Sequence, residues 1–162
     1  MKKLFIIVLA ALLGISAHAQ DAKSIYNKFS DEKGVSAVYI SPSMFKLMGK
    51  LPELEVGNGG EKVDITPLVQ SLKGFYLINT SDKGIINRMN SDVKKLLGND
   101  SYELMMEAKN DGETVRFYTD GDDNIIRSFV MMATDGDDAT FISMDGLINR
   151  QALERAIGSA TR

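Results

Sequence analysis

Four Asp-Gly pairs recur in the last third of this chain and constrain its fold more than any other feature. They stand at Asp111-Gly112, Asp120-Gly121, Asp135-Gly136 and Asp145-Gly146. The first three separate runs of alternating apolar residues, and Asp-Gly in that setting indicates a β-hairpin because glycine tolerates positive φ. The sequence therefore predicts a four-stranded antiparallel meander. Its strands are expected around Tyr102–Lys109, Thr114–Thr119, Ile125–Met132 and Ala139–Met144.

Two further strands and several helices are expected before and after the meander. Val35–Ile40 is β-branched and aromatic on both faces and predicts a well-covered strand, and Gly74–Asn79 predicts another. Helical spacing or start signals predict helices from Asp21, from Ser41-Pro42 and over Ile85–Leu97. They also predict a short helix that starts at Asp64–Pro67 and a last helix from an Asn149 cap to Gly158, with one long loop over Pro52–Lys62. This order predicts an α+β fold, with about six mainly antiparallel strands and helices packed on one face.

The N-terminal segment has the features of a secretory signal peptide. Lys2 and Lys3 precede an apolar run from Leu4 to Ile15, and Ala17-His18-Ala19 fits a cleavage site. The run is short for a membrane span. We therefore expect residues 1–19 to be removed and residues 20–162 to fold as a single domain. The protein is expected to be exported, either to the periplasm or into the medium, with no transmembrane span after cleavage.

Loss of that segment would change which reactive side chains the chain contains. His18 is the only histidine and the chain has no Cys or Trp, so no histidine base, thiol nucleophile or ordinary zinc site would remain. The net charge would change from −3 to −5 with the loss of Lys2 and Lys3, and no basic patch points to nucleic acid. No cofactor is expected, and Asp, Glu, Lys, Tyr and Ser are left for any chemistry.

The pentapeptide TDGDD occurs twice, at Thr119–Asp123 and Thr134–Asp138, and raises the question of calcium. Successive turns of a meander lie at opposite ends of the sheet, about 20 Å apart, so the two copies cannot share an ion. Neither copy has the glycine or the bidentate glutamate of an EF-hand loop where that loop requires them. Polar hairpin turns are the favoured interpretation. A looser site remains open where two turns meet at one end, with Asp111, Asp135 and Asp137 as weak metal candidates.

Alternation along the first two meander strands predicts a binding face. Tyr102, Leu104, Met106 and Ala108 form a core-like set, as do Val115 and Phe117, whereas the opposite sets are largely polar. We therefore expect a packed face beneath helices and an open face. The open face would carry Glu103, Met105, Glu107, Arg116 and Tyr118. Tyr, Met and Arg are enriched at interfaces, so this face is the candidate binding surface, with an ordinary solvated sheet as the alternative.

The C-terminal half is similar to a known family. The resemblance rests on the strands at Val115–Tyr118 and Ile125–Met132 and on the segment Ile142–Gly146 leading to a last amphipathic helix. These features resemble the closing segment of domain-of-unknown-function family 4252 (DUF4252), small exported proteins of Bacteroidetes-type bacteria. The resemblance implies an envelope protein and supplies no catalytic or binding residues.

Three functions stay open at this level. The missing reactive side chains and the secretory segment favour a non-enzymatic envelope protein that binds an unknown protein or ligand. The alternatives are a carboxylate-based hydrolase acting on cell-wall or dietary glycans, which needs two carboxylates in one cleft, and a calcium-stabilised module.

Overall fold

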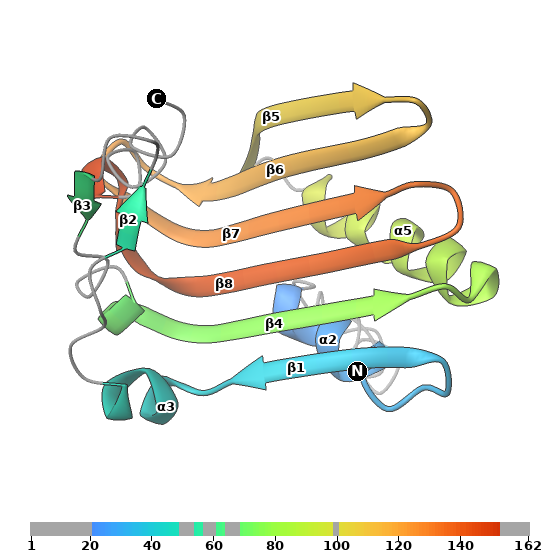
Figure 1. Cartoon of the computed structure of the whole chain (residues 1–162), viewed down its shortest axis with the longest axis horizontal. Coiled ribbons are helices and arrows are strands. Elements are labelled where there is room, and N and C mark those ends of the chain that lie inside the picture. Colours follow the sequence, from blue (N-terminus) through green and yellow to red (C-terminus); the bar gives the residue numbers. More distant parts are fainter. Residues whose placement is uncertain (1–20, 49–53, 57–60, 64–68, 99–100, 153–162) are drawn as a thin grey trace, which may run out of the picture.

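The computed structural model describes residues 21–48, 54–56, 61–63, 69–98 and 101–152, and a six-stranded antiparallel sheet dominates them (Figure 1). The strand order is β1-β4-β8-β7-β6-β5. The bounds are Val35–Ile40 for β1, Leu72–Thr80 for β4, Tyr102–Asn110 for β5, Glu113–Gly121 for β6, Ile125–Thr134 for β7 and Ala139–Asn149 for β8. The predicted α+β fold and its C-terminal four-stranded meander are confirmed.

Helices α2 (Ala22–Phe29) and α5 (Lys83–Leu97) lie side by side on one face of this sheet (Figure 1). Each begins at an aspartate cap: the Asp21 carboxylate accepts from Ser24 N, and the Asp82 carboxylate accepts from Ile85 N. Capping of this kind satisfies an N–H group that has no partner within the helix. The predicted stripe on α5 is buried, with Met89 and Leu96 almost completely inaccessible to solvent.

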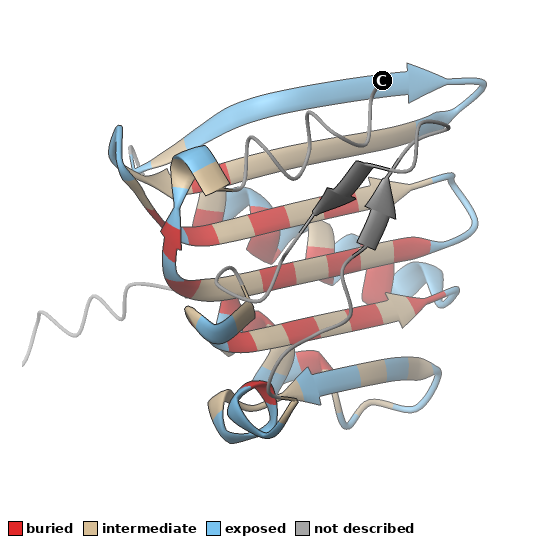
Figure 2. Ribbon diagram, turned by 60° about the vertical axis from the view of Figure 1, so that its left-hand side comes forward, coloured by how far each residue is buried: buried red, intermediate tan, exposed pale blue. Residues whose placement is uncertain are grey.

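The main core lies between these helices and the central strands. Buried and partly buried residues alternate along β4, β7 and β8, as Figure 2 shows, so every second side chain faces the helices. Those side chains include Ile78, Val130 and Phe141, none of which is measurably exposed. The edge strand β5 differs, because its residues from Glu103 to Asn110 are exposed.

Two of the four Asp-Gly pairs do not form the turns expected of them. The β5–β6 turn has positive φ at Asp111 and Gly112, and Gly136 in the β7–β8 turn has φ 91°. Asp120-Gly121, in contrast, still belongs to β6, and the turn follows it at residues 122–124. Asp145-Gly146 lies inside β8, so the chain does not turn there, and the last helix begins only after Asn149.

Other expectations about the edges of the sheet need correction. Strand β1 is an edge strand rather than a well-covered one, and Tyr39 is 48% exposed. Helix α3 (Pro42–Leu47) forms as expected after Ser41, but only Phe45 is buried, while Leu47 is 81% exposed. Part of the expected long loop is a two-stranded antiparallel hairpin, β2 (Leu54–Val56) with β3 (Glu61–Val63).

Three sequence-based expectations lie wholly or partly outside the described residues. These are the signal peptide at 1–19, the start of the short helix expected at Asp64–Pro67, and the last helix beyond Ala152. The start of that last helix is described, and Ala152 N donates to Asn149 Oδ1 at 3.0 Å. The predicted Asn149 cap is therefore confirmed.

Candidate functional site

The five residues predicted to share an open face do not share one. An irregularity in the β5–β6 register falls between Leu104 and Met106, so Met105 has no partner on β6. An extra residue of this kind shifts the alternation of side chains by one position. Glu103 and Glu107 therefore lie on opposite faces of the sheet, with Met105 at the bulge between them.

Arg116 and Tyr118 lie on the helix-covered face, the reverse of the prediction. Tyr118 is opposite Val130 and packs against the main core. Arg116 is opposite Met132 on one side and Glu107 on the other, and its Nε contacts Glu107 Oε2 at 2.5 Å. Hydrogen bonds from Lys109 and Arg116 lower the pKa of Glu107 below its ordinary value. These residues form an ion-pair cluster at the margin of the helix layer.

The prediction failed on β5 because only the start of that strand is packed, where Tyr102 contacts the main core. Leu104 and Met106 are each 49% exposed, so neither is a core residue. The apolar alternation along 102–108 indicated a buried side, but beyond Tyr102 the residues of this edge strand are exposed. The predicted open face of β5 and β6 is therefore not formed, and a different apolar surface lies on the sheet.

That other surface is a row of large apolar side chains across the face opposite α2 and α5. Directly opposed residues of antiparallel strands project to the same face, so the register identifies its members. They are Val38, Leu77, Ile142, Met131, Phe117 and Met106, one from each strand. The outer two are 45% and 49% exposed, and the inner four are partly buried. We call these six residues the apolar row.

A second set of apolar residues runs beside the row and is packed at one end of the sheet. Its members are also directly opposed across neighbouring strands. They are Ile40, Phe75, Met144 and Phe129. The first three pack against a small cluster that includes Phe45 of α3 and Ile126 of β7. Helix α3 therefore closes that end of the face, whereas in the described part of the chain no helix packs on the apolar row.

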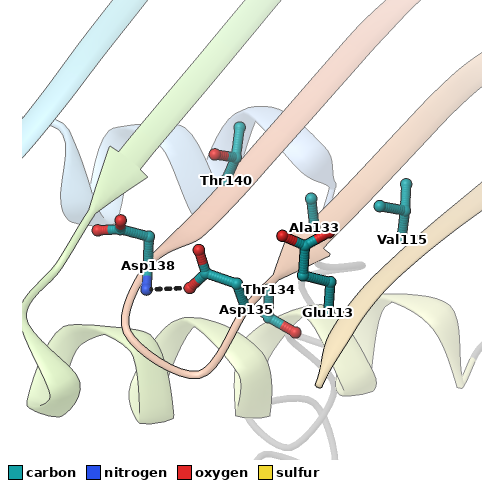
Figure 3. Close-up of a pocket in the computed structure, with 7 residues that line it drawn as sticks. All are labelled: Glu113, Val115, Ala133, Thr134, Asp135, Asp138 and Thr140. Atoms are coloured by element: carbon teal, nitrogen blue, oxygen red, sulfur yellow. Dashed lines mark hydrogen bonds between the residues drawn. The ribbon is translucent and has the colours of Figure 1, made fainter. Parts of the chain in front are cut away.

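A pocket opens beside the second TDGDD copy, at the other end of the same sheet (Figure 3). Its volume is about 230 Å³, and its lining combines carboxylates with small side chains: Glu113, Val115, Ala133, Thr134, Asp135, Asp138 and Thr140. Two of these carboxylates, Asp135 and Asp138, are engaged locally. Asp135 Oδ1 accepts from Asp137 N and Asp138 N, and Ser81 Oγ donates to the Asp138 carboxylate. The hydrogen bonds from the backbone N–H groups of Asp138 and Asp137 lower the pKa of Asp135.

The three weak metal candidates are placed in turns at this end. Asp111 is in the β5–β6 turn, Asp135 caps the β7–β8 turn, and Asp137 contacts Lys83 Nζ at 3.4 Å. Within the described ranges, no three or more His, Cys, Asp or Glu side chains are grouped as ligands for a metal ion. Each aspartate is accounted for by its role in a turn or by its ion pair.

The first TDGDD copy makes a different turn from the second. Its fourth residue, Asp122, accepts from Asn124 N and Ile125 N, whereas the second residue, Asp135, does this in the other copy. The backbone hydrogen bonds lower the pKa of Asp122. The same pentapeptide therefore forms two different turns. In each turn an aspartate carboxylate accepts the backbone hydrogen bonds that close it, but the aspartate stands at a different position of the pentapeptide.

One polar chain on the helix-covered face was not predicted from the sequence. Tyr102 Oη donates to Ser128 Oγ at 3.1 Å, and Ser128 Oγ donates to Asp145 Oδ1 at 3.0 Å. Burial raises the pKa of both Asp145 and Tyr102. Ser128 donates to a partly buried carboxylate and accepts a hydrogen bond from a tyrosine hydroxyl, so it is held in place rather than activated. These three side chains therefore form a structural network. They come from three strands, which a sequence pattern does not reveal.

Comparison with known proteins identifies a family. Residues 26–156 match the family described as "Domain of unknown function (DUF4252)". No curated protein and no solved structure matches the chain. No helix in the described part of the chain is both long and apolar enough to cross a membrane.

Proposed function

The chain belongs to the DUF4252 family, and we propose that it is an exported, non-enzymatic binding module that holds a protein partner on the apolar row. The observation that supports this proposal is the row itself. Contiguous apolar residues on an accessible face are uncommon in soluble proteins and mark interaction surfaces.

The dimensions of the row favour a protein surface over a small molecule. Six neighbouring strands spaced about 4.8 Å apart place its ends about 24 Å from each other. Small-molecule sites are concave and enclose most of the ligand, whereas Met and Phe on a broad surface suit the centre of a protein interface. Methionine adds adaptability, because its unbranched side chain fills irregular gaps.

The side chains available for chemistry support a binding role. The chain has no Cys and one His, which falls in the expected signal peptide. The described carboxylates mostly close turns or hold lysine and arginine. Asp145, whose pKa is raised, is partly buried and accepts a hydrogen bond from the buried Ser128, so this carboxylate is held within the sheet network.

The test introduces one negative charge into the row. Met131→Glu and Val38→Glu should abolish partner capture from the envelope of the source cells and lower the fluorescence of a bound apolar dye. Asn87→Glu, on the exposed side of α5, is the matched control and should leave both unchanged. Equal capture by all three variants would remove the apolar row from consideration.

Export and the absence of catalysis have separate tests. N-terminal sequencing of the protein recovered from cell fractions should begin near Gln20 in an extracytoplasmic fraction. Purified protein should turn over neither glycan nor peptidoglycan substrates. A turnover that disappears with a single Asp or Glu substitution would favour the hydrolase alternative.

A further inference from the structure

The outer edge of β5 is the candidate for a second interaction surface, beside the end of the apolar row at Met106. Strand β5 ends the sheet, and in the described part of the chain nothing pairs with its outer side. Its residues from Glu103 to Asn110 are exposed on both faces. An exposed strand edge offers unpaired backbone groups to another strand, and proteins protect such edges with bulges and charges.

The protection on β5 is uneven. The bulge at Met105 interrupts the N-terminal half, where regular pairing with a further strand would be broken. From Met106 to Asn110 the strand keeps an unbroken register with β6. The C-terminal half is therefore the part of the edge that can accept a partner strand.

The β5–β6 turn determines which residues present their backbone outward. It is a two-residue loop with positive φ at both positions, Asp111 at 44° and Gly112 at 91°, flanked by the pair Asn110 and Glu113. The residues that flank such a loop form a hydrogen-bonded pair, and bonded pairs then alternate along the ladder. Ala108 is thus bonded to β6, while the N–H and C=O groups of Glu107 and Lys109 point outward.

The charges at these two positions favour one occupant. We propose that a second copy of the chain pairs antiparallel with β5, with Ala108 opposite Ala108 across a twofold axis. Glu107 of each copy then stands opposite Lys109 of the other, at the positions whose backbone groups are free to bond. Interfaces of this symmetry are self-complementary, and a strand with one acid and one base two residues apart meets that condition.

The proposed pairing also agrees with the faces of the sheet. Glu107 and Lys109 both project to the helix-covered side, because they oppose Arg116 and Thr114. Within one chain Glu107 already contacts both Arg116 and Lys109, at 2.5 and 2.8 Å. In the dimer each Glu107 would in addition face Lys109 of the other copy, so the four charges alternate across the pair. Ala108 is small, which suits the close approach at the centre of the pair. The apolar rows of the two copies end up on the same side of one continuous sheet.

Complementary charge variants test this proposal. Residues 20–162 should form a concentration-dependent dimer in sedimentation analysis. Lys109→Glu alone places an acid opposite an acid at both pairs, and Glu107→Lys alone places a base opposite a base, so each variant should be monomeric. Mixing the two variants restores an acid opposite a base at both pairs and should give a one-to-one heterodimer. Circular dichroism of each variant checks that the fold is retained.

Cysteine cross-linking tests the register. The chain contains no cysteine, so a single Ala108→Cys substitution reports on one contact. Directly opposed residues at a non-hydrogen-bonded position have Cα atoms about 4.5 Å apart, within the range of a disulfide. Mild oxidation should yield a covalent dimer from Ala108→Cys and none from Glu103→Cys, which lies beyond the bulge. A wild-type monomer at the highest soluble concentration, dimers that persist in both charge variants, or equal cross-linking of the two cysteine variants would overturn the proposal.

Discussion

Phe117 on β6 and Phe129 on β7 contact each other on the sheet face opposite α2 and α5, with ring centroids 5.5 Å apart. Both side chains are partly buried, whereas Phe141 on the helix-covered face is completely buried. The aromatic contact therefore belongs to an accessible apolar surface rather than to the main core.

This difference predicts unequal costs for removing the two rings. Phe141→Ala should lower the free energy of unfolding by about 3–5 kcal/mol, the usual cost of deleting a buried Phe. Phe117→Ala should cost only about 1–2 kcal/mol, because less apolar area leaves water and one aromatic contact is lost. Urea denaturation of both variants checks the order. A Phe117→Ala cost equal to that of Phe141→Ala would mean that the apolar row is core.

The pKa of Asp145 predicts a pH-dependent stability. Burial raises that pKa in the folded state, so the ionised carboxylate disfavours folding. The penalty is absent below the unfolded-state pKa, about 3.9, and grows as pH rises through the higher folded-state value. Asp145→Asn can still accept the Ser128 hydrogen bond, and its stability relative to wild type should increase between about pH 4 and pH 7. A pH-independent difference in the free energy of unfolding would contradict the raised pKa.

Asp92 makes the opposite prediction at lower pH. Burial alone would raise its pKa, but Lys28 of α2 and Lys95 of α5 contact the carboxylate and lower it overall. The stability that this carboxylate contributes should be lost as pH falls below about 3.9 towards the depressed folded-state value. Lys28→Ala should cost about 0.5–1 kcal/mol at neutral pH, since the lysine is half exposed and screened by solvent.

A thermal unfolding series checks this α2–α5 contact. Lys94→Ala, on the same helix as Asp92 and exposed, is the control and should leave the melting temperature nearly unchanged. Equal effects of Lys28→Ala and Lys94→Ala would show that the ion pair contributes nothing measurable.

The two TDGDD glycines should respond differently to alanine. Gly136 needs positive φ but has open space around its Cα, so Gly136→Ala should cost about 1 kcal/mol. At Gly121 an added Cβ would lie 2.3 Å from the Ile125 carbonyl oxygen, a backbone atom that cannot move aside easily. Gly121→Ala should therefore cost more than Gly136→Ala in denaturant unfolding. The reverse order would contradict the two turn geometries.

Calcium should have little effect on stability. The turn aspartates bond to backbone N–H groups, so millimolar Ca²⁺ against EDTA should leave the melting temperature nearly unchanged. A bound ion at a hundredfold excess over Kd would add about 2.7 kcal/mol. A rise of many degrees would favour the calcium-stabilised alternative.

Local sequence signals determined the elements and the order of the meander strands. The apolar spacing of Ile85, Met89 and Val93 was sufficient to predict α5 because helix periodicity is carried by neighbouring residues. In the same way, Asp111-Gly112 predicted its hairpin, since both residues adopt the backbone angles that the turn requires. The fold class followed from these local patterns in their chain order.

Tertiary structure alone decided which face of each strand is covered and where the edges of the sheet lie. Alternation along β6 places Phe117 and Tyr118 on opposite faces of the sheet. Tyr118 packs against the core only because α2 and α5 cover its face. On β5 a bulge at Met105 exchanges the faces partway along the strand, and its edge position leaves Leu104 and Met106 exposed. The two TDGDD copies likewise form different turns although their sequences are identical. Strand β6 ends at Gly121, the third residue of its copy, whereas β7 ends at Thr134, the first residue of the other. Alternation along a strand determines which residues share a face. Which of the two faces is buried depends on contacts between residues distant in the chain.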